Sequence, residues 1–269
     1  MKPYVIDHDL HIHSQLSLCS SDPEQTPERI LRYAKENGLS TVCLTDHFWD
    51  PAVSGASDWY AIQNYDHIKE ALPLPQDENV RFLFGAETEM DKNFTIGVSD
   101  KTLDELDFII IPTTHLHMDG FTIDAEIGYD DDGIKRRREL YIKRFEKLLS
   151  ADLPFHKVGI AHLTCSLACR HPENGIRLLI DGIPDETYAE LFSYAAKKGL
   201  GIELNFDPFK FEGADRENEL RPYRIAKRCG CKFYFGSDAH HPKGLKEAAQ
   251  HFRKVAELLE LDENDKFKV

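Results

Sequence analysis

Residues 4–13 read YVIDHDLHIH and predict a β-strand, assigned to Tyr4–Leu10, with two chemically different faces. Successive side chains of a strand point to opposite faces. The even positions Ile6, Leu10 and Ile12 are apolar, whereas the four odd positions from 7 to 13 are all ionisable: Asp7, Asp9, His11 and His13. A parallel strand that is covered by helices on both faces should be apolar throughout. The pattern therefore favours a barrel with a polar site at one interior end over an open doubly wound sheet.

The rest of the chain alternates short apolar runs with stretches of helical periodicity, which predicts an α/β fold with a parallel sheet. Six more strands are expected at Thr41–Thr45, Arg81–Ala86, Asp107–Pro112, Lys157–Ala161, Gly201–Asn205 and Lys232–Phe235. Helices are expected near Pro27–Asn37, Trp59–Ala71, Ile134–Leu149, Asp185–Lys198, Leu220–Arg228 and Lys243–Leu261. Because nothing resembles a linker or a repeat, residues 1–269 are expected to form a single domain.

The charge of the chain excludes some classes of partner. Its 47 acidic and 33 basic side chains give a formal net charge of −14, which disfavours binding to long nucleic acids or to a membrane surface. There is no apolar run of about eighteen residues, and the N-terminus has aspartates and histidines where a signal peptide would be apolar. A cytoplasmic protein is therefore expected.

Ionisable side chains recur where six of the predicted strands end. Pairs two positions apart on a strand project the same way, with Cα atoms about 6.5–7 Å apart, near enough to share an ion. In a parallel barrel the carboxyl ends of the strands converge on one face. The residues are His11 and His13, Asp46 and His47, Glu87 and Glu89, His115 and His117, His162, and Asp238 and His240.

This set offers at least eight nitrogen or oxygen ligands, too many for one zinc ion, which takes three or four. Two or three divalent ions therefore fit the set better than one. Mixed imidazole and carboxylate ligands suit zinc, manganese or iron, and the residue types alone do not choose among them.

In chain order, these motifs closely resemble those of the PHP family, named for polymerase and histidinol phosphatase. They are Asp9-Leu-His11-Ile-His13-Ser14, Thr45-Asp46-His47, Gly85-Ala-Glu87, Thr114-His115, Ala161-His162 and Gly236-Ser-Asp238-Ala-His240. Glu203-Leu-Asn205 also resembles the E-x-N strand of the family's stand-alone phosphatase branch. The resemblance implies a distorted (β/α)7 barrel similar to a TIM barrel.

The same resemblance implies which residues hold each ion. One metal would be bound by His11, His13, Glu87 and Asp238, and a second by Glu87, His115 and His162 with Glu87 bridging. A third would be bound by His47 and His240 together with the residue at position 19, where this chain has Cys19 in place of the family's histidine. Asp9 and Asp46 are expected to accept imidazole N–H bonds and thereby fix the histidine tautomers.

The resemblance implies a metal-dependent phosphoesterase that hydrolyses a small phosphomonoester, similar to the histidinol-phosphate or nucleotide phosphatases of the family. A water molecule activated by two or three ions would attack phosphorus. If the third metal is absent, His47 or His240 is expected to protonate the leaving alkoxide. Candidates for contact with the phosphate are the basic residues Arg136, Arg137, Arg138, Arg170 and Lys243.

Two other classes of function stay open. One is a non-catalytic, regulatory metal-binding module, which is the role that the resemblance to PHP domains in some replicative polymerases implies. The other is an amidohydrolase-like barrel that cleaves a C–N bond, because such barrels also carry H-x-H strands and a late aspartate. Those enzymes usually bridge their metals with a modified lysine, and no predicted strand ends in a lysine.

Overall fold

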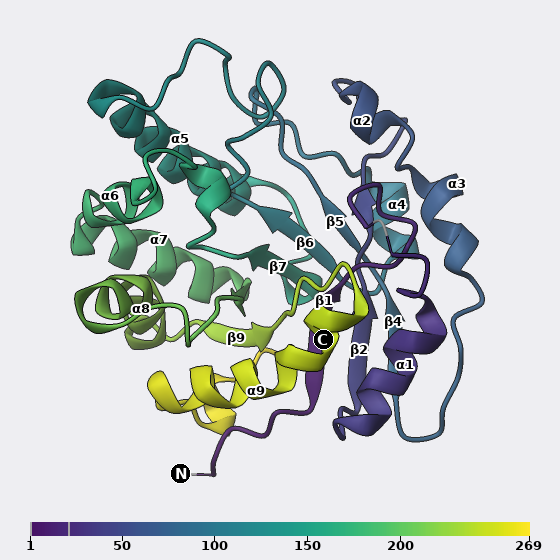
Figure 1. The fold of residues 1–269 in the computed structure, drawn as a ribbon. Helices are drawn as coiled ribbons and strands as arrows, with labels where there is room; N and C mark the ends of the chain where they lie inside the picture. Colours follow the sequence, from purple (N-terminus) through teal and green to yellow (C-terminus); the bar gives the residue numbers. More distant parts are fainter. Residues whose placement is uncertain (1, 21) are drawn as a thin grey trace.

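Nine parallel strands, surrounded by helices, form the centre of the protein in a computed structural model that describes residues 2–20 and 22–269 (Figure 1). The strands are β1 (His8–Ile12), β2 (Thr41–Leu44), β3 (His47–Phe48), β4 (Arg81–Phe84), β5 (Ala86–Thr88), β6 (Ile109–Pro112), β7 (Val158–Ala161), β8 (Gly201–Leu204) and β9 (Lys232–Phe235). They form a sheet of order β1-β2-β4 and a sheet of order β3-β5-β6-β7-β8-β9. The seven expected strands are therefore present, with the second and third each divided in two.

The first and last strands in this order meet at their carboxyl ends. The Asp238 N–H donates to the His11 carbonyl at 2.8 Å, and the His13 N–H donates to the Ala239 carbonyl at 3.1 Å. Among the described residues this seam has one parallel bridge, between Ile12 and Ala239, in place of a continuous ladder. The strand order thus returns to its start in a distorted, TIM-like barrel, as the sequence predicts.

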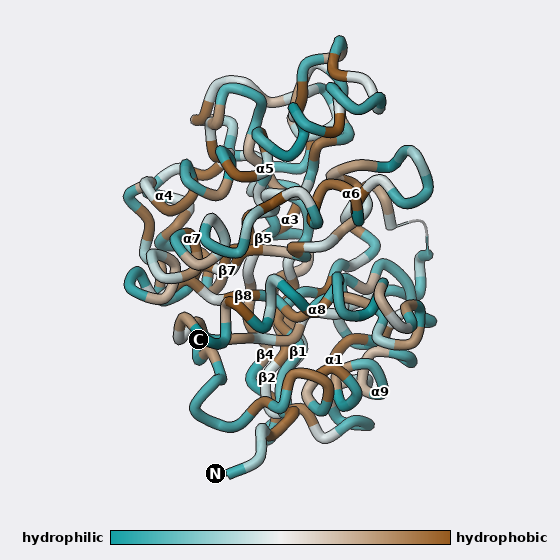
Figure 2. Tube along the Cα trace, turned by 90° about the vertical axis from the view of Figure 1, so that its left-hand side faces the viewer, coloured by the Kyte–Doolittle hydropathy of each residue, from teal (hydrophilic) through white to brown (hydrophobic). Residues whose placement is uncertain are grey.

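The helices lie outside the strands. They are α1 (Pro27–Glu36), α2 (Asp58–Ala61), α3 (Tyr65–Ile68), α4 (Asp100–Glu105), α5 (Asp131–Ser150), α6 (Gly175–Asp181), α7 (Asp185–Lys198), α8 (Gly213–Arg228) and α9 (Pro242–Leu258). Hydrophobic and hydrophilic residues alternate along the outer helices, so each has an apolar side to turn inward (Figure 2). None of the helices in the described chain is long and apolar enough to cross a membrane.

Several element boundaries differ from the sequence prediction, and local caps that override periodicity explain two of them. The helix expected over Trp59–Ala71 is broken where the Asn64 side chain accepts the His67 N–H and starts α3. The Ser99 side chain caps the short helix α4 in the same way, and neither α4 nor α6 was predicted. α8 begins at Gly213, earlier than the predicted Leu220, and β1 begins at His8 rather than Tyr4.

A β-bulge in β1 changes which side chains share a face. Asp9 pairs with Val42 and Ile12 pairs with Leu44. An advance of three residues along β1 therefore matches an advance of two residues along β2. As a result Leu10 packs with the interior side chain of Cys43, whereas the Asp9 carboxylate accepts a hydrogen bond from Tyr33 on α1 at 3.0 Å. The prediction of one continuous polar face is therefore wrong for Asp9.

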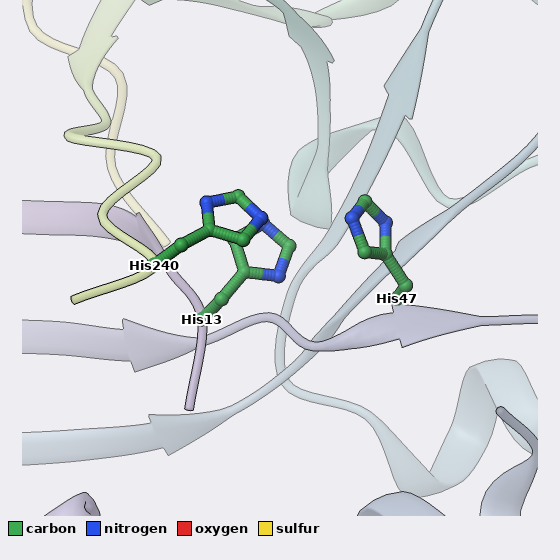
Figure 3. A group of neighbouring side chains, drawn as sticks. All are labelled: His13, His47 and His240. Carbon is green, nitrogen blue, oxygen red and sulfur yellow. The ribbon is translucent and has the colours of Figure 1, made fainter. Parts of the chain in front are cut away.

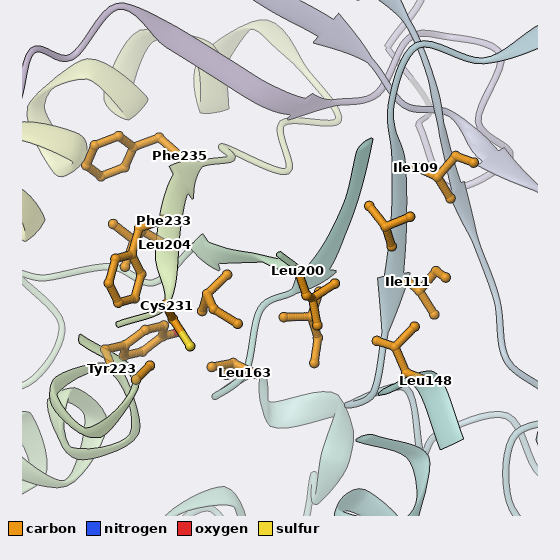
Figure 4. Packing of buried hydrophobic residues seen from close by; sticks show 14 of the residues in the cluster. Ile109, Ile111, Leu148, Leu163, Leu200, Leu204, Tyr223, Cys231, Phe233 and Phe235 are labelled. Atoms are coloured by element: carbon orange, nitrogen blue, oxygen red, sulfur yellow. The ribbon is translucent and has the colours of Figure 1, made fainter. Parts of the chain in front are cut away.

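The core has two layers, one on each side of the strands. Ile109 and Ile111 belong to the outer group of buried side chains, in which Ile111 lies near Leu148 of α5 (Figure 4). Ile110, between them, faces the interior, where a second group of buried apolar side chains fills the barrel below the polar residues. This group, which we call the apolar floor, consists of Leu10, Cys43, Leu83, Phe108, Ile110, Ala161, Tyr234 and Phe267.

We predict that Gly159→Ala destabilises the protein, because the added Cβ would overlap the buried Tyr234 ring of the apolar floor. Overpacking of this kind costs about 1–3 kcal/mol, to be measured by urea denaturation. Gly128→Ala is the matched control, since its Cβ would lie 3.9 Å from the nearest side chain. Equal stabilities of the two variants would contradict this account of the floor.

Candidate metal centre

Eight ionisable side chains converge above the apolar floor, at the carboxyl ends of the strands. They form three groups, in each of which one nitrogen or oxygen atom per residue lies within 4.8 Å of the others. Glu87 and His13 each belong to two groups. We call the eight residues the central cluster: His11, His13, His47, Glu87, His115, His162, Asp238 and His240.

The first group joins the end of β1 to Glu87 within β5 and to Asp238 in the loop after β9. The Nε2 atoms of His11 and His13 face each other at 3.0 Å, and His13 Nε2 lies 3.1 Å from Asp238 Oδ1. Glu87 Oε2 lies 3.4 Å from His13 Nε2 and 3.6 Å from His11 Nε2. Two imidazole nitrogens and two carboxylate oxygens therefore converge from one side, which is an arrangement that a divalent ion can satisfy.

The second group uses the other oxygen of Glu87. Its Oε1 lies 3.4 Å from His162 Nε2 and 4.0 Å from His115 Nε2, and it is a buried atom without a hydrogen-bond partner. An unpaired buried carboxylate oxygen is costly, so the atom fits a cation ligand. Burial alone would raise the pKa of Glu87, but the facing His47 and His11 hold it well below its ordinary value.

The third group consists of His13, His47 and His240 (Figure 3). The ring centroids of His13 and His240 are 4.1 Å apart, and those of His13 and His47 are 4.5 Å apart. Burial lowers the pKa of His240 to about 3 and also lowers that of His47. Both rings are therefore neutral at pH 7 and carry a free lone pair, as metal ligands require.

Cys19 is not part of this group. The residue is exposed, although partial burial of its thiol and the carboxylates of Glu87 and Asp238 raise its pKa to about 12. In the structure it is His13 that completes the group with His47 and His240, where the family resemblance implied Cys19.

The outward nitrogens of the cluster histidines are held by side chains that the sequence analysis did not assign to this task. Nδ1 of His11 donates to Glu203 at 2.6 Å, and Nδ1 of His115 donates to Glu89 at 2.7 Å. Such bonds fix the tautomer and leave each Nε2 to face the centre. The remaining partners are Ser17 for His13, Thr114 for His162 and the Asp238 carbonyl for His240.

Asp9 and Asp46 do not accept imidazole N–H bonds, which corrects the prediction for both. Asp9 instead accepts from the Ser237 N–H and the Tyr33 hydroxyl. Asp46 supports His13 indirectly, through Ser17, whose hydroxyl donates to Asp46 at 2.6 Å. Ser17 thus keeps its lone pairs for His13 Nδ1, 2.9 Å away.

A buried ion pair supports Glu89. Arg144 of α5 donates to Glu89 at 2.7 Å, and both side chains are at most 1% exposed. Arg144 also donates to the carbonyls of Met90 and Pro112. Burial would raise the pKa of Glu89, but His115 and Arg144 lower it below its ordinary value. The carboxylate is thus kept charged beside His115.

Two of the five basic residues expected to contact phosphate are engaged elsewhere. Arg137 is buried and donates to the carbonyls of Gly128, Leu116 and Ile127, and Arg138 donates to the carbonyls of Leu178 and Leu179 in α6. These bonds hold loops and a helix end in place. The other three, Arg136, Arg170 and Lys243, are exposed.

A cavity of roughly 740 Å³ opens beside the central cluster, with His162 and Asp238 in its wall. The rest of the wall comes from the segments after β7 and β8 and from α6 and α8. Its basic side chains are Arg177 and Lys210, and none of the five predicted basic residues lines it. We call it the adjacent cavity. No sequence motif marked Arg177 or Lys210, because only the tertiary fold brings them to the cluster.

The comparisons agree with this geometry. The PHP domain family matches residues 9–207, and no curated protein matches the chain. A histidinol phosphate phosphatase from Lactococcus lactis, complexed with zinc, L-histidinol and phosphate, is 15% identical with a TM-score of 0.56, over 99% of this chain and 100% of its own. A probable 2-pyrone-4,6-dicarboxylic acid hydrolase from Acinetobacter baumannii with citric acid bound is 14% identical with a TM-score of 0.50, over 97% of each chain.

A parallel α/β barrel with a histidine and carboxylate cluster at its carboxyl face defines a metal-dependent hydrolase. Because the family match spans more than half of the chain, the protein belongs to the PHP family. The resemblance drawn from the sequence motifs is confirmed.

We expect Arg144→Met to destabilise the protein by about 3–5 kcal/mol, because it leaves the buried Glu89 carboxylate without its cation. The double variant with Arg144→Met and Glu89→Gln should lose less unfolding free energy than the sum of the losses in the two single variants. A double-mutant cycle in urea would measure this. Lys143→Met is the control, since Lys143 makes an exposed pair with Glu146 on the same helix. Additive costs would show that the pair is not coupled.

A second prediction concerns Glu219, which lines the adjacent cavity and is 5% exposed. Burial raises its pKa from 4.5 to about 7, so its ionisation destabilises the fold as pH rises from 4.5 through 7. The change in unfolding free energy is up to about 3 kcal/mol. Glu219→Gln should therefore gain stability relative to wild type between pH 5 and pH 8 in urea denaturation. If the difference in unfolding free energy between Glu219→Gln and wild type did not change with pH, the raised pKa of Glu219 would be refuted.

Proposed function

We propose that the protein is a phosphoesterase that hydrolyses a small phosphomonoester with two or three divalent ions bound in the central cluster. The observation that carries this proposal is the shared, buried Glu87, whose two oxygens face two separate groups of imidazoles. Divalent ions bound there would supply Lewis-acid activation of water and of the phosphoryl group. Zinc, manganese and iron all suit these ligands.

Two positions are better supplied with ligands than the third. His13 Nδ1 is occupied by Ser17, so its single free nitrogen, Nε2, can serve only one of its two groups. If it binds with His11, Glu87 and Asp238, the third position keeps only His47 and His240 from this chain. We therefore assign a two-metal core, in the first two groups, and a weaker third position.

The roles of His47 and His240 follow from their protonation state. His240 donates through Nδ1 to the Asp238 carbonyl, and its low pKa leaves Nε2 as a lone pair. A ring in this state accepts a cation more readily than it delivers a proton. This favours a ligand role for both histidines over the role of acid for the leaving alkoxide.

The size and charge of the site suit a small phosphate ester. The adjacent cavity can hold a molecule of drug-like size, and it adjoins His162 and Asp238. Bound cations would attract a phosphate even though the whole chain carries −14. The Lactococcus lactis structure with histidinol and phosphate, which shares the fold, supports a substrate that resembles histidinol phosphate.

The amidohydrolase-like alternative has less support. Enzymes of that kind usually bridge their metals with a modified lysine. The buried polar residues of the described chain include no lysine, and Glu87 is the residue that would bridge bound ions. A regulatory, non-catalytic module would also bind metal, so only a measurement of turnover separates it from an enzyme.

We expect purified protein loaded with Mn²⁺ or Zn²⁺ to release phosphate from p-nitrophenyl phosphate. His13→Ala or Asp238→Ala should lower kcat/KM by about 100-fold or more and reduce the metal content measured by mass spectrometry, because each removes a ligand. His156→Ala, at an exposed position away from the cluster, should behave like wild type. Metal-loaded protein without turnover on a broad panel of phosphate esters would rule out the enzyme.

A further inference from the structure

His47 differs from the other five histidines of the central cluster in how its ring is held. Each of the other five engages its Nδ1 atom in a hydrogen bond. The buried Nδ1 of His47 has no hydrogen-bond partner among the described residues, although Glu87 Oε2 lies 3.0 Å from it. A turn of 180° about the Cβ–Cγ bond would put a carbon atom where this nitrogen lies. Another contact must therefore fix the orientation of the ring.

Two aromatic residues of α2 supply such contacts. The ring centroids of Trp59 and His47 are 5.2 Å apart at an interplanar angle of 64°, and those of Tyr60 and His47 are 6.0 Å apart at 87°. Both pairs meet edge to face, which is a favourable arrangement for aromatic rings. His47 is only 7% exposed, so it is enclosed by its neighbours. The two rings thereby limit the orientations that the imidazole can adopt.

Gln63 fixes the position of Trp59 relative to the strand that carries His47. The Gln63 side chain donates through Nε2 to the Trp59 carbonyl at 3.2 Å, and the Trp49 N–H donates to the Gln63 carbonyl at 2.9 Å. Trp49 follows β3 directly, two residues after His47. Gln63 is fully buried, so water does not compete for its hydrogen bonds. The turn with Trp59 is therefore attached to β3.

Of the two aromatic residues, Trp59 is the one that acts mainly on His47. The Tyr60 hydroxyl also donates to Glu89 at 3.4 Å, and its buried ring packs in an aromatic group with Trp49. A change at Tyr60 would disturb those contacts as well. Trp59 is half-buried at the edge of the same group, and its ring meets those of His47 and Tyr60. A substitution of Trp59 therefore isolates the contact with the imidazole.

Building on the metal binding of the proposed function, we propose that Trp59 is a positioning residue for His47. Its ring keeps the imidazole in one orientation and so keeps a nitrogen available at the third position, which His47 forms with His13 and His240. It takes the place of the hydrogen bond that orients each of the other cluster histidines. His47 is not a ligand of the two-metal core, so Trp59 acts on the third position alone.

A titration of metal-free protein with Zn²⁺ in a chelator buffer tests this inference, with the bound ions counted by native mass spectrometry. Trp59→Leu should keep the first two ions, which shows that it is folded, and should raise the Kd of the third by about tenfold or more. Trp59→Phe should restore most of this affinity, because it keeps an aromatic ring. Ile62→Ala, at a side chain 58% exposed just after α2, is the control and should match wild type.

A double variant shows whether Trp59 acts through His47. In a His47→Ala background, Trp59→Leu should change the binding of Zn²⁺ no further, because the imidazole that it orients is absent. The same loss in both backgrounds, or an equal loss of all bound ions in Trp59→Leu, overturns the inference.

The orientation of the ring can also be observed directly, by nuclear magnetic resonance on metal-free protein labelled with ¹⁵N in its histidines. The ring signals of His47, assigned by their loss in His47→Ala, should form one set in wild type and Trp59→Phe and should be doubled or broadened in Trp59→Leu. An unchanged His47 spectrum in Trp59→Leu overturns the inference, and this spectrum decides alone if wild type binds only two ions. Neither measurement involves turnover, so a protein that hydrolyses no ester would disprove the phosphoesterase and leave the role of Trp59 standing.

Discussion

The site depends on one buried carboxylate, that of Glu87. It is 1% exposed and has imidazoles of five histidines within 4 Å of its oxygens: His11, His13, His47, His115 and His162. An isolated buried carboxylate would be strongly unfavourable. The surrounding nitrogens make its charged form stable, and they arrange the histidines around a common point. Each strand that contributes one of these residues must therefore end at the same level of the barrel.

Holding this cluster in place requires support from outside it. Glu203 accepts from the His11 imidazole and from the His162 backbone N–H, which ties β1 to β7 across the interior. Arg144 keeps Glu89 charged beside His115. Gly236 lies so close to Glu203 and His11 that a Cβ atom there would displace them. The polar side chains above the apolar floor are thus held in fixed positions by buried hydrogen bonds. A rigid, preorganised site needs such bonds.

The arrangement also separates two tasks in space. The central cluster is the place for cations and for the phosphoryl group, and the adjacent cavity is the place for the remainder of a substrate. Its charged residues come from outer helices, such as Arg177 on α6 and Glu219 on α8, and from the loop between β8 and α8, such as Asp207 and Lys210. Loops and outer helices of a barrel can vary without disturbing the strand ends. Chemistry and specificity are therefore carried by different elements of the fold.

The sequence by itself determined the parallel barrel and the residues of the central cluster, because both depend on local order. Apolar runs of strand length recur along the chain, and ionisable residues such as His115 and His162 follow them directly. Parallel strands then bring those ends together whatever the details of packing. The helix expected near Pro27–Asn37 is likewise present, since the Thr26 side chain caps it within one turn.

Only the tertiary structure decided which groups support the cluster and which line the cavity. The β1 bulge turns Asp9 outward, and no alternation in the sequence reveals a bulge. Glu203 reaches His11 from 192 residues away, and Arg144 reaches Glu89 from 55 residues away. Arg137 was a candidate for phosphate contact by its charge, yet packing buried it among backbone carbonyls. Such roles depend on distances between elements, which local sequence patterns do not contain.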